Sequence, residues 1–334
     1  MTIKELANEL NMSTTTVSRV LTGQEKKYRI SERTAQLVRA KVDSLGFKPN
    51  QIARNLRLRK TNTIGLVIPD ISNPFFANLA RTVEEELRNR NKMVLLCDTK
   101  DETSLEEESI NLLLDRKVDG LLVAPVGEKW EHLPLDSSTP VVLMDRYFDN
   151  GALPYVTTDN YHGAYEATQF LIDQGHKDIA CIQGRINTSA NQNRLSGFKS
   201  ALSENKLDAN QAMVLGDDYS MENGYGSTQT LLNQAKRPTA IFALNNQIAI
   251  GAMKALSEAS LHIPDDISLI AFDEQTYFEL LLPPLTAVKQ PMKEIGKKAV
   301  ELLFDLLDNK EVESHKLKPI LMNRSSVRTL NTTT

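Results

Sequence analysis

Polar side chains directly follow most of the short apolar runs that this sequence predicts as β-strands. The positions are Asp70, Asp98, Asp145-Arg146, Asp159-Asn160, Asn245-Asn246 and Asp273-Glu274. Ligands bind at the carboxyl ends of strands in open α/β sheets, so these residues are candidates for a shared cleft. Asp, Asn and Arg together suit a polyhydroxylated ligand, because its hydroxyl groups both donate and accept hydrogen bonds. Each residue alone is also an ordinary turn former, and the repetition along the chain favours a binding site.

A cation and several aromatic rings add to this candidate site. Arg194 falls in the first turn of a helix predicted for 192–205, where the helix dipole disfavours a cation. That placement favours a ligand or a carboxylate partner for Arg194 over a solvated side chain. The rings of Tyr219, Phe75 and Phe76 can each present a face to a sugar, although the two phenylalanines are also suited to the core.

A second chemically suggestive cluster lies near the N-terminus, on a predicted helix capped by Ser13. Its outer face carries short hydroxyl side chains and one cation, namely Thr14, Thr15, Thr16, Ser18 and Arg19. Threonine offers a hydroxyl to base edges or phosphate and a methyl group to thymine, and arginine grips guanine or phosphate. A capping cluster on a solvated helix accounts for the same residues, so the local pattern leaves both interpretations open.

Three predicted helices position this second cluster. Thr2 and Glu5 have capping-box spacing at the start of a first helix, and the short turn that ends at Ser13 gives helix-turn-helix spacing with the second. Ser31 begins a third helix, which Gly46 ends. The basic loop 23–29 between the second and third helices includes Tyr28, and we expect it to follow a phosphate backbone.

The first sixty residues form a basic module on an acidic body. They hold 13 Lys and Arg against 5 Asp and Glu, a balance of +8, whereas the whole chain carries −4 and residues 61–334 therefore carry −12. This distribution indicates a polyanion-binding head attached to a part with another role. The module ends in a short helical stretch, 51–57, that needs a twin or a ligand to stay folded. Leu56 beside arginines matches the apolar wedge of minor-groove binders, with a charged linker as the alternative.

Beyond residue 61 the chain alternates apolar runs with helical segments. The predicted strands are Ile64–Ile68, Met93–Cys97, Gly120–Ala124, Val141–Met144, Tyr155–Thr158, Ile179–Ile182, Met213–Leu215, Ile241–Leu244, Leu269–Phe272 and Ala287–Val288. The predicted helices are 75–91, 105–117, 161–174, 192–205, 221–235, 246–259 and 292–308. This alternation predicts α/β architecture with parallel sheets covered by helices, and the length favours two such lobes over one.

With these residues in view, the sequence resembles the lactose/galactose repressor family of bacterial transcription regulators over essentially its full length. The motifs that carry the resemblance are Thr2-Ile3-Lys4-Glu5-Leu6-Ala7, Ser13-Thr14-Thr15-Thr16-Val17-Ser18-Arg19-Val20-Leu21, Pro49-Asn50-Gln51-Ile52-Ala53-Arg54-Asn55-Leu56, Ile64-Gly65-Leu66-Val67-Ile68-Pro69-Asp70, Val118-Asp119-Gly120, Arg194-Leu195-Ser196-Gly197-Phe198 and Arg237-Pro238-Thr239-Ala240-Ile241-Phe242. Together these motifs are highly specific, whereas each alone is modest.

The resemblance implies an all-α helix-turn-helix head on a two-lobed core like that of periplasmic binding proteins. The expected domains are a DNA-binding head at 1–47, a hinge helix and linker at 48–61, and an effector-binding and dimerisation core at 62–330. Within that core the N-lobe comprises about 62–160 plus 289–319, and the C-lobe about 161–288 plus 320–330.

The resemblance also assigns roles to individual residues. Thr15, Thr16 and Arg19 match base-reading positions, and Leu56 matches the hinge leucine that wedges into a base step, accompanied by Ala53 and Arg57. We expect the DNA-contacting set to be completed by Ser13, Thr14, Ser18, Tyr28, Asn50 and Arg54. Effector-contacting positions are matched by Asp145, Arg194, Tyr219, Asn245, Asp273 and Gln290, with Asp70, Phe75, Phe76 and Asp159 as cleft walls.

This sequence departs from the family pattern at two effector-side positions. Asn246 stands where the family usually has Asp, and Ala190 where a polar residue is common, which puts the details of the effector in doubt. The loop 23–29 is longer than in the shortest members and resembles the fructose- and sucrose-type regulators.

The resemblance predicts a regulator, and more narrowly a repressor of carbohydrate catabolic genes. Its partners are a near-palindromic double-stranded operator, a sugar or sugar-derived effector, and a second copy in a homodimer that can extend to a tetramer. An effector that reorients the lobes shifts the population competent for DNA. Control by a phosphocarrier protein or a non-sugar corepressor is the alternative. A sensor that has lost DNA binding and an enzyme on a Rossmann-like body are further rivals.

Composition and motifs narrow the remaining classes. The chain has no twenty-residue apolar stretch and begins directly in a helix, so we expect a cytoplasmic bacterial protein, nucleoid-associated when bound to DNA. Cys97 and Cys181 lie in apolar strands without metal-ligand spacing and are expected to be buried thiols. The five His residues show no partner pattern, and no phosphate-binding loop follows a strand. We therefore expect no metal, no cofactor and no enzyme activity.

Overall fold

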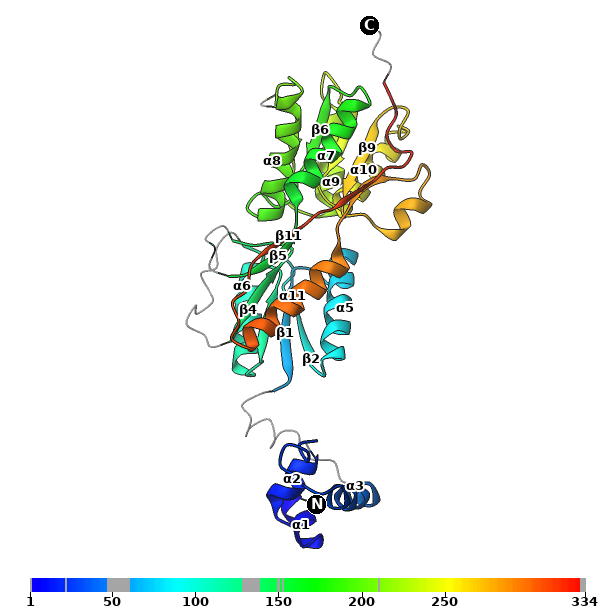
Figure 1. Cartoon of the computed structure of the whole chain (residues 1–334). Helices are drawn as coiled ribbons and strands as arrows, with labels where there is room; N and C mark the ends of the chain where they lie inside the picture. The colour runs from blue at the N-terminus through cyan, green and yellow to red at the C-terminus, as the bar shows by residue number, and fades with distance from the viewer. Residues whose placement is uncertain are drawn as a thin grey trace. The chain divides into compact units, whose positions relative to one another are not determined.

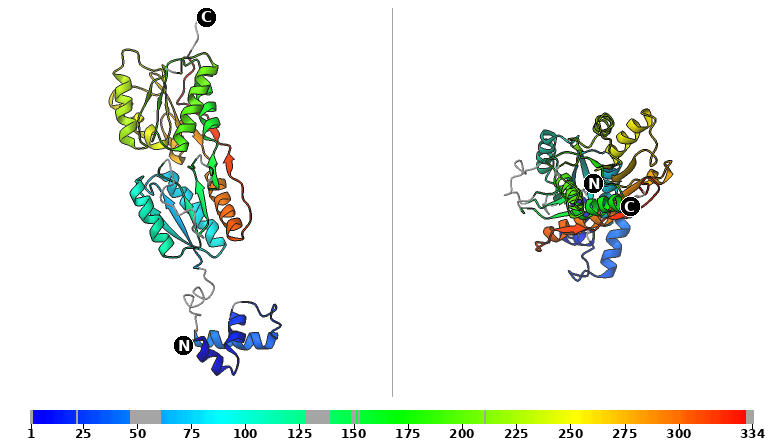
Figure 2. Two further views of the ribbon diagram at one scale, coloured as in Figure 1. Left: turned by 90° about the vertical axis from the view of Figure 1, so that its left-hand side faces the viewer. Right: turned by 90° about the horizontal axis from the view of Figure 1, so that it is seen from above.

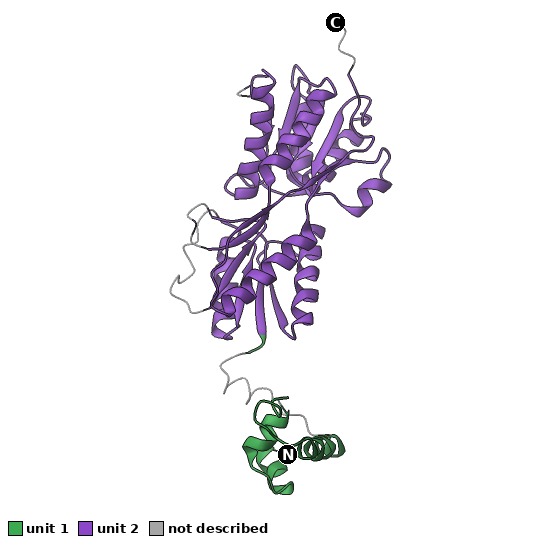
Figure 3. Ribbon diagram, in the orientation of Figure 1, with its two compact units in different colours: residues 1–62 green, residues 63–334 purple. Residues whose placement is uncertain are grey.

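The protein is described by a computed structural model that covers residues 2–21, 23–46, 61–127, 139–148, 151, 153–209 and 211–330. The chain divides into two compact units, residues 1–62 and 63–334 (Figure 3). The expected hinge residues Asn50, Ala53, Arg54, Leu56 and Arg57 lie outside the described residues.

The described part of the first unit contains three helices, α1 (Ile3–Glu9), α2 (Thr14–Leu21) and α3 (Glu32–Leu45). Each begins with a hydroxyl cap, as the sequence predicts. Thr2 and Glu5 exchange both capping-box hydrogen bonds, and the Ser13 and Ser31 hydroxyls each accept an amide proton three residues on. Gly46 ends α3 in the left-handed conformation at φ 56°. The helices enclose a small core, whose buried members are Leu6, Ala7, Val17, Val20, Ala35 and Val38.

The second unit contains two six-stranded sheets, each the centre of one lobe (Figures 1 and 2). The first sheet has the order β11-β5-β4-β3-β1-β2 and is parallel throughout. Its strands are β1 (Thr63–Ile68), β2 (Met93–Asp98), β3 (Gly120–Val123), β4 (Val141–Met144), β5 (Tyr155–Thr158) and β11 (His315–Leu317). Its helices are α5 (Pro74–Asn89), α6 (Thr103–Asp115) and α11 (Met292–Leu307).

The second sheet has the order β12-β10-β9-β8-β6-β7, with only β12 antiparallel to its neighbour. Its strands are β6 (Ile179–Ile182), β7 (Val214–Leu215), β8 (Ala240–Ala243), β9 (Ser268–Phe272), β10 (Thr286–Lys289) and β12 (Ile320–Met322). Its helices are α7 (Asn160–Asp173), α8 (Ser189–Glu204), α9 (Met221–Leu232) and α10 (Asn246–Glu258), and a 3₁₀ turn, η1 (Thr276–Leu280), follows β9.

Alternation along the central strands explains why both sheets are covered on both faces. In β1, Ile64 and Leu66 pack toward α5 and α11, whereas Val67 points to the opposite face and packs with α6. In β8, Ile241 packs with α9 and α10, and Phe242 packs on the other face with α7 and α8. The predicted α/β fold with two helix-covered sheets is confirmed.

The predicted elements differ from the observed ones at the start of α8, which is described with the cleft, and at the C-terminal end. Strand β11 was not predicted, because His315-Lys316-Leu317 is short and contains one large apolar residue. The final strand was expected near 320–327 but ends at Met322. Ser326 beyond it is held next to β9, where its carbonyl accepts the Leu269 amide proton and its hydroxyl accepts from the Thr286 amide and donates to the Leu269 carbonyl.

Three chain crossings connect the two lobes and are bonded to each other. They run from β5 into α7, from β10 into α11, and from β11 into β12. Thr158 on the first crossing donates a short hydrogen bond to the Gln290 side chain on the second. The Asp159 amide donates to the Leu317 carbonyl on the third at 2.8 Å. The crossings therefore form one connected hinge beside the carboxyl ends of both sheets. None of the described helices is both long and apolar enough to span a membrane.

Candidate effector cleft and DNA-reading helix

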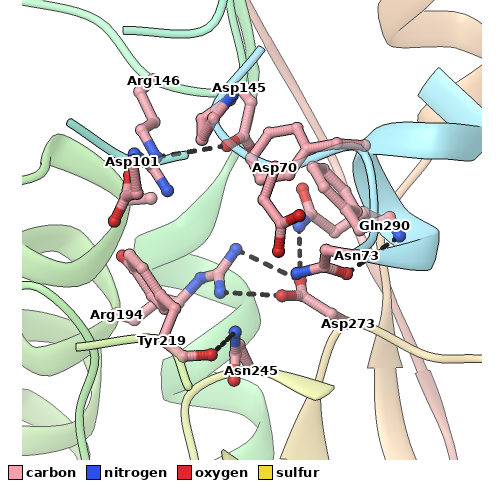
Figure 4. A pocket seen from close by; sticks show the side chains of 14 residues that line it. Asp70, Asn73, Asp101, Asp145, Arg146, Arg194, Tyr219, Asn245, Asp273 and Gln290 are labelled. Atoms are coloured by element: carbon pink, nitrogen blue, oxygen red, sulfur yellow. Dashed lines mark hydrogen bonds and ion pairs between the residues drawn. The ribbon is translucent and has the colours of Figure 1, made fainter. Parts of the chain in front are cut away.

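A cavity lies between the two lobes at the carboxyl ends of their strands (Figure 4). The residues that line it are Pro69, Asp70, Asn73, Phe75, Phe76, Asp101, Asp145, Arg146, Ala190, Arg194, Tyr219, Asn245, Asp273 and Gln290. Nine of the ten residues predicted for the effector site are among them. The cavity volume is about 70 Å³, less than half of the about 150 Å³ that holds a benzene molecule in an engineered cavity. A sugar-sized ligand therefore requires the lobes or the lining side chains to move apart.

Asp159 is the predicted cleft residue that does not line this cavity. It caps the N-terminus of α7, where its carboxylate accepts the His162 amide proton at 3.1 Å and pairs with the His162 ring at 2.8 Å. Its place directly after β5 gave it the same sequence pattern as Asp70 and Asp145. The capping role that any Asp at a helix start can fill explains its position.

Arg194 is the centre of a buried network in the second lobe. Its Nε donates to the Asn160 side chain at 2.7 Å, and its Nη1 donates to the Leu244 carbonyl at 2.6 Å. Both terminal nitrogens lie 3.3 Å from the Asp273 carboxylate, and the guanidinium stacks 3.8 Å from the centre of the Phe272 ring. Every partner fixes the plane of the guanidinium, so Arg194 holds Asp273 in one orientation at the cavity wall.

The sequence-based reason for singling out Arg194 was wrong, although its expected carboxylate partner is present. Helix α8 begins at Ser189, three residues earlier than predicted, so Arg194 is its sixth residue and lies beyond the first turn. Thr188 caps this earlier start by accepting the Asn191 amide proton. The unfavourable dipole interaction therefore does not apply, and burial with Asp273 accounts for the side chain.

Amide side chains complete the second lobe's wall. Gln290 donates to the Asp273 Oδ1 at 2.5 Å. The Asn245 side chain caps α10 by accepting the Ile248 amide proton and donates to the Tyr219 carbonyl at 3.2 Å. These contacts fix the two amide groups in place at the cavity wall.

Asp145 and Arg146 form the polar wall of the first lobe. Asp145 directly follows β4 in the left-handed conformation at φ 63°, and it is only 4 % exposed. Burial raises the pKa of its carboxyl group to about 6, an effect that the charges of Arg146 and Arg194 partly oppose. Its Oδ1 is buried and accepts no hydrogen bond among the described residues. A ligand that donates a hydrogen bond to this oxygen would satisfy it.

Arg146 is held by groups on several sides. Its Nη1 donates to Asp101 at 3.0 Å and to the Pro125 carbonyl at 3.2 Å. The guanidinium lies 5.7 Å from the Phe76 ring centre and 5.1 Å from that of Tyr219. Arg146 therefore reaches across the cleft toward an aromatic ring of the other lobe.

The aromatic residues of the cleft are more buried than a stacking platform requires. Phe75 and Phe76 meet edge to face, 5.0 Å apart, and both also belong to the core of the first lobe. Tyr219 lies directly over Gly184, and its hydroxyl bonds Thr188 at 2.7 Å. Burial raises the pKa of the Tyr219 phenol, so the ring stays neutral. The two phenylalanines therefore belong to the core and also line the cavity, and contact of their rings with a sugar stays a prediction.

Sequence reasoning missed two polar residues of the cleft and left a third out of the effector set. Asn73 caps α5 through the Phe75 amide, and its side chain also accepts a hydrogen bond from Asn246 of the other lobe at 3.1 Å. The sequence signal that could have identified Asn73 is an Asn followed by Pro at the start of a helix. Asp101 lies three residues beyond β2 and carried no distinguishing signal. Arg146 was noted at a strand end but was not among the expected effector contacts.

The described DNA-reading candidates lie along α2 and in the loop that follows it, with Ser13 to Thr16 at the start of the helix and Arg19 in its last turn. Ser13 and Thr16 bond each other at 2.9 Å and form the cap, so the capping interpretation holds for these two. Thr14 and Thr15 are exposed on the first turn. The Arg19 guanidinium stacks on the exposed Tyr28 ring, 3.7 Å from its centre, which places loop 23–29 beside the helix. Ser18 is half-buried on the same helix.

No group of three or more His, Cys, Asp or Glu residues able to hold a metal ion occurs among the described residues. Cys181 is buried in β6, and burial raises the pKa of its thiol; Cys97 is half-buried in β2 and its pKa is also raised by burial. Neither thiol is therefore an activated nucleophile in this structure.

Two family models match the chain, and together they span most of it. Residues 2–50 match the model described as bacterial regulatory proteins, lacI family, and residues 61–322 match periplasmic binding proteins and sugar binding domain of LacI family. The chain is 33% identical over 335 residues to the HTH-type transcriptional repressor PurR of Vibrio atlanticus (strain LGP32), covering 99% of each protein. It is 34% identical over 333 residues to the ribose operon repressor of Haemophilus influenzae, covering 98% of this chain and 99% of that protein.

A solved structure adds a likeness in the larger unit. The LacI family transcriptional regulator from Enterococcus faecium, solved with bound ribose, superimposes with a TM-score of 0.74 at 32% identity, covering 80% of this chain and 100% of that one. The relatives named here are transcriptional regulators. The chain belongs to the lacI family of bacterial regulatory proteins and is a DNA-binding transcriptional repressor with a small-molecule effector domain.

Proposed function

We propose that the effector is a small neutral sugar, of the size of a pentose such as ribose, and that the chain represses carbohydrate catabolic genes. The observation that carries this proposal is the convergence of fixed acceptors and donors on one small cavity. Asp145 and Asp273 accept from sugar hydroxyls, while Arg146 and Asn245 donate to hydroxyl and ring oxygens. A polyol needs both kinds of partner around its ring.

The charge of the cavity favours a neutral sugar over a sugar phosphate. Four carboxylates line it, from Asp70, Asp101, Asp145 and Asp273, against two guanidinium groups. A phosphate group carries a charge of about −1.5 to −2 at pH 7, and it would have to enter a site with excess negative charge.

Calorimetric titration of the purified protein tests the effector class. We expect saturable binding of D-ribose or another neutral pentose and weaker binding of ribose 5-phosphate and adenine. Asp273→Asn should abolish the binding, while Asp305→Asn, on the solvent side of α11 and away from the cavity, should not change it. Tight binding of adenine or of the phosphorylated sugar, with no response to free pentoses, would overturn the neutral-sugar proposal.

On the DNA side, we propose that two heads of a homodimer read a near-palindromic operator in the bacterial cytoplasm. Thr15, Thr16 and Arg19 read base edges, and Leu56 wedges between bases at the centre of the site. The exposure of Thr15 at the start of α2 supports the first part. Deleting residues 1–60 should abolish operator binding and preserve sugar binding. Leu56→Ala should weaken specific DNA binding far more than non-specific binding; equal loss on both DNAs would refute the wedge.

We further propose that the protein acts by binding and not by turnover. Arg146, Arg194, Asp145 and Asp273 are engaged with one another or with backbone carbonyls, and this arrangement favours recognition of a ligand over attack on it. Prolonged incubation with the bound sugar should return it chemically unchanged by mass spectrometry and NMR. Appearance of a product at a rate that scales with protein concentration would contradict this proposal.

A further inference from the structure

One ion pair joins the two lobes at the edge of the effector cleft. The Asp101 carboxylate, in the loop after β2 of the first lobe, lies 3.1 Å through Oδ2 from the Nε of Arg185 in the second lobe. Its other oxygen accepts the hydrogen bond from Arg146 at 3.0 Å. One carboxylate is thus shared between an arginine that lines the cavity and an arginine of the opposite lobe.

The loop that presents Asp101 is fixed to the first lobe. Lys100 and Asp101 both adopt the left-handed conformation, at φ 49° and 56°, a costly arrangement for two consecutive non-glycine residues. The Asp101 amide donates to the Pro69 carbonyl at 2.8 Å, and buried Thr99 donates both its amide and its hydroxyl to the Ile68 carbonyl. This backbone strain is held in place by the end of β1, and its result is to place the carboxylate between two lobes.

The segment of the second lobe that carries Arg185 makes further contacts with the first lobe. Within the segment itself, the Arg185 carbonyl accepts a hydrogen bond from the Thr188 hydroxyl at 3.0 Å. Next to it, the Ser189 hydroxyl accepts the Tyr147 amide proton at 2.9 Å, and Asn193 donates to the Tyr147 hydroxyl at 3.2 Å. Residues 185–193 therefore contact the first lobe both at Asp101 and at the residue that follows Arg146.

We propose that Asp101 is a positioning residue that couples the cavity to lobe closure, by fixing Arg146 toward the ligand while holding the second lobe through Arg185. This inference rests on the proposed function, because it assumes that a ligand enters between the lobes. The Arg185 side chain does not line the cavity, and it is about one third exposed. Breaking the ion pair should therefore loosen closure without removing a ligand contact.

On this proposal the room for a sugar comes from movement of the lining side chains, so that the Asp101–Arg185 pair persists when the ligand is bound. The closed cleft then has to open for the ligand to leave, and the pair has to break when it does. Removing Arg185 should act on the dissociation rate, because the pair forms only in the closed state. Fully exposed ion pairs contribute little because water and salt screen them; this pair is partly buried and shares its carboxylate with Arg146, so salt screens it less but still weakens it. We expect Arg185→Ala to raise the dissociation rate of D-ribose about fivefold, as for loss of a partly exposed ion pair of about 1 kcal/mol.

Stopped-flow measurement on the full chain, with D-ribose as the probe, tests this expectation. Arg185→Ala should accelerate dissociation and leave the association rate within about twofold, as interface changes generally do. Raising the salt concentration should accelerate dissociation from the wild type and not from the variant. Asp101→Glu should partly restore what Asp101→Ala loses, since it keeps the carboxylate. The control Lys236→Ala breaks an ion pair with Asp178 inside the second lobe and should leave both rates unchanged.

A ligand-free measurement separates failure of this inference from failure of the proposed effector. The Tyr147 amide is bonded across the cleft, so its hydrogen exchange reports opening, whereas the Asp145 amide bonds Val156 within the first lobe. Arg185→Ala should accelerate exchange at Tyr147 and not at Asp145. Unchanged exchange at Tyr147 would overturn the coupling role, whatever the sugar result. If D-ribose fails to bind the wild type while Tyr147 responds as expected, the effector proposal fails and the coupling role stands.

Discussion

Replacing Asp145 by Asn should stabilise the effector-free protein at neutral pH and abolish its binding of the effector. The carboxyl group is buried, and one of its oxygens accepts no hydrogen bond among the described residues. Asn keeps the shape and removes the charge. It leaves no new unpaired cation, because Arg146 retains Asp101 and Arg194 retains Asp273. The charge of Asp145 thus destabilises the protein without effector, and a bound ligand that donates a hydrogen bond to this carboxylate offsets the destabilisation.

The magnitude follows from the pKa of Asp145, which burial raises from 3.8 to about 6. Because the folded state binds this proton more tightly than the unfolded chain, the free energy of unfolding falls as the pH rises from about 4 to about 6. Each pKa unit corresponds to about 1.4 kcal/mol, so the full loss is about 3 kcal/mol above pH 6. Asp145→Asn escapes this loss and should be more stable than the wild type by up to about 3 kcal/mol at pH 7.5.

Thermal and urea unfolding of the wild type and Asp145→Asn from pH 4 to pH 8 measure this difference. The gain should be near zero at pH 4, grow between pH 4 and pH 6, and then stay constant. The melting temperature at pH 7.5 should rise by roughly 6 °C or more. Asp305→Asn, which removes an exposed carboxylate paired with Lys310, should show no such dependence. A destabilised Asp145→Asn at pH 7.5, or a gain equal at pH 4 and pH 7.5, would refute the reasoning.

Three further changes test other parts of the molecule. Arg194→Lys should lower the free energy of unfolding by about 3 kcal/mol and abolish sugar binding, because one ammonium group cannot replace a planar guanidinium that meets Asp273 and two other acceptors. Unchanged stability and unchanged sugar binding in calorimetry would contradict this prediction. Gly184→Ala places a Cβ 2.0 Å from the Tyr219 ring and so displaces this ring. The affinity for the sugar should fall at least tenfold while DNA binding by the head persists. An unchanged sugar affinity would show that Tyr219 does not shape the cleft. Ser31→Ala removes the cap of α3 and should destabilise only the head, by about 1 kcal/mol, which amide exchange in the two units would separate.

Local patterns were sufficient for the regular elements. Strands such as Val141–Met144 and Ile179–Ile182 are continuous apolar runs buried on both faces, so their limits in the sequence match those in the structure. The helix caps at Thr2 and Ser31 likewise depend only on nearby residues. The start of α8 was misplaced because the residues before Gln192 are small and polar, and its true cap, Thr188, was not recognised.

Contacts between segments that are far apart in the sequence could not be predicted from local patterns. Asp101 reaches the cleft through a strained turn whose conformation its own sequence does not predict. The Asn73–Asn246 bond joins helix starts 173 residues apart, and only the packing of two lobes brings them together. Asp70 and Asp159 had the same pattern after a strand, yet one lines the cavity and the other caps a helix. A carboxylate that follows a strand is predicted to lie at the carboxyl edge of the sheet. Tertiary packing decides whether it then faces the cavity or caps a helix.

The most direct test of the account is the affinity of the full-length protein for a palindromic duplex selected from random DNA, measured at fixed salt during titration with D-ribose and related neutral pentoses. One of these sugars should change the dissociation constant for the duplex at least tenfold. This change should be lost in Asp273→Asn, while the affinity for non-specific DNA stays the same. A sugar that saturates the cleft by calorimetry and leaves the affinity for the selected duplex unchanged would contradict the claim that the cleft controls the head.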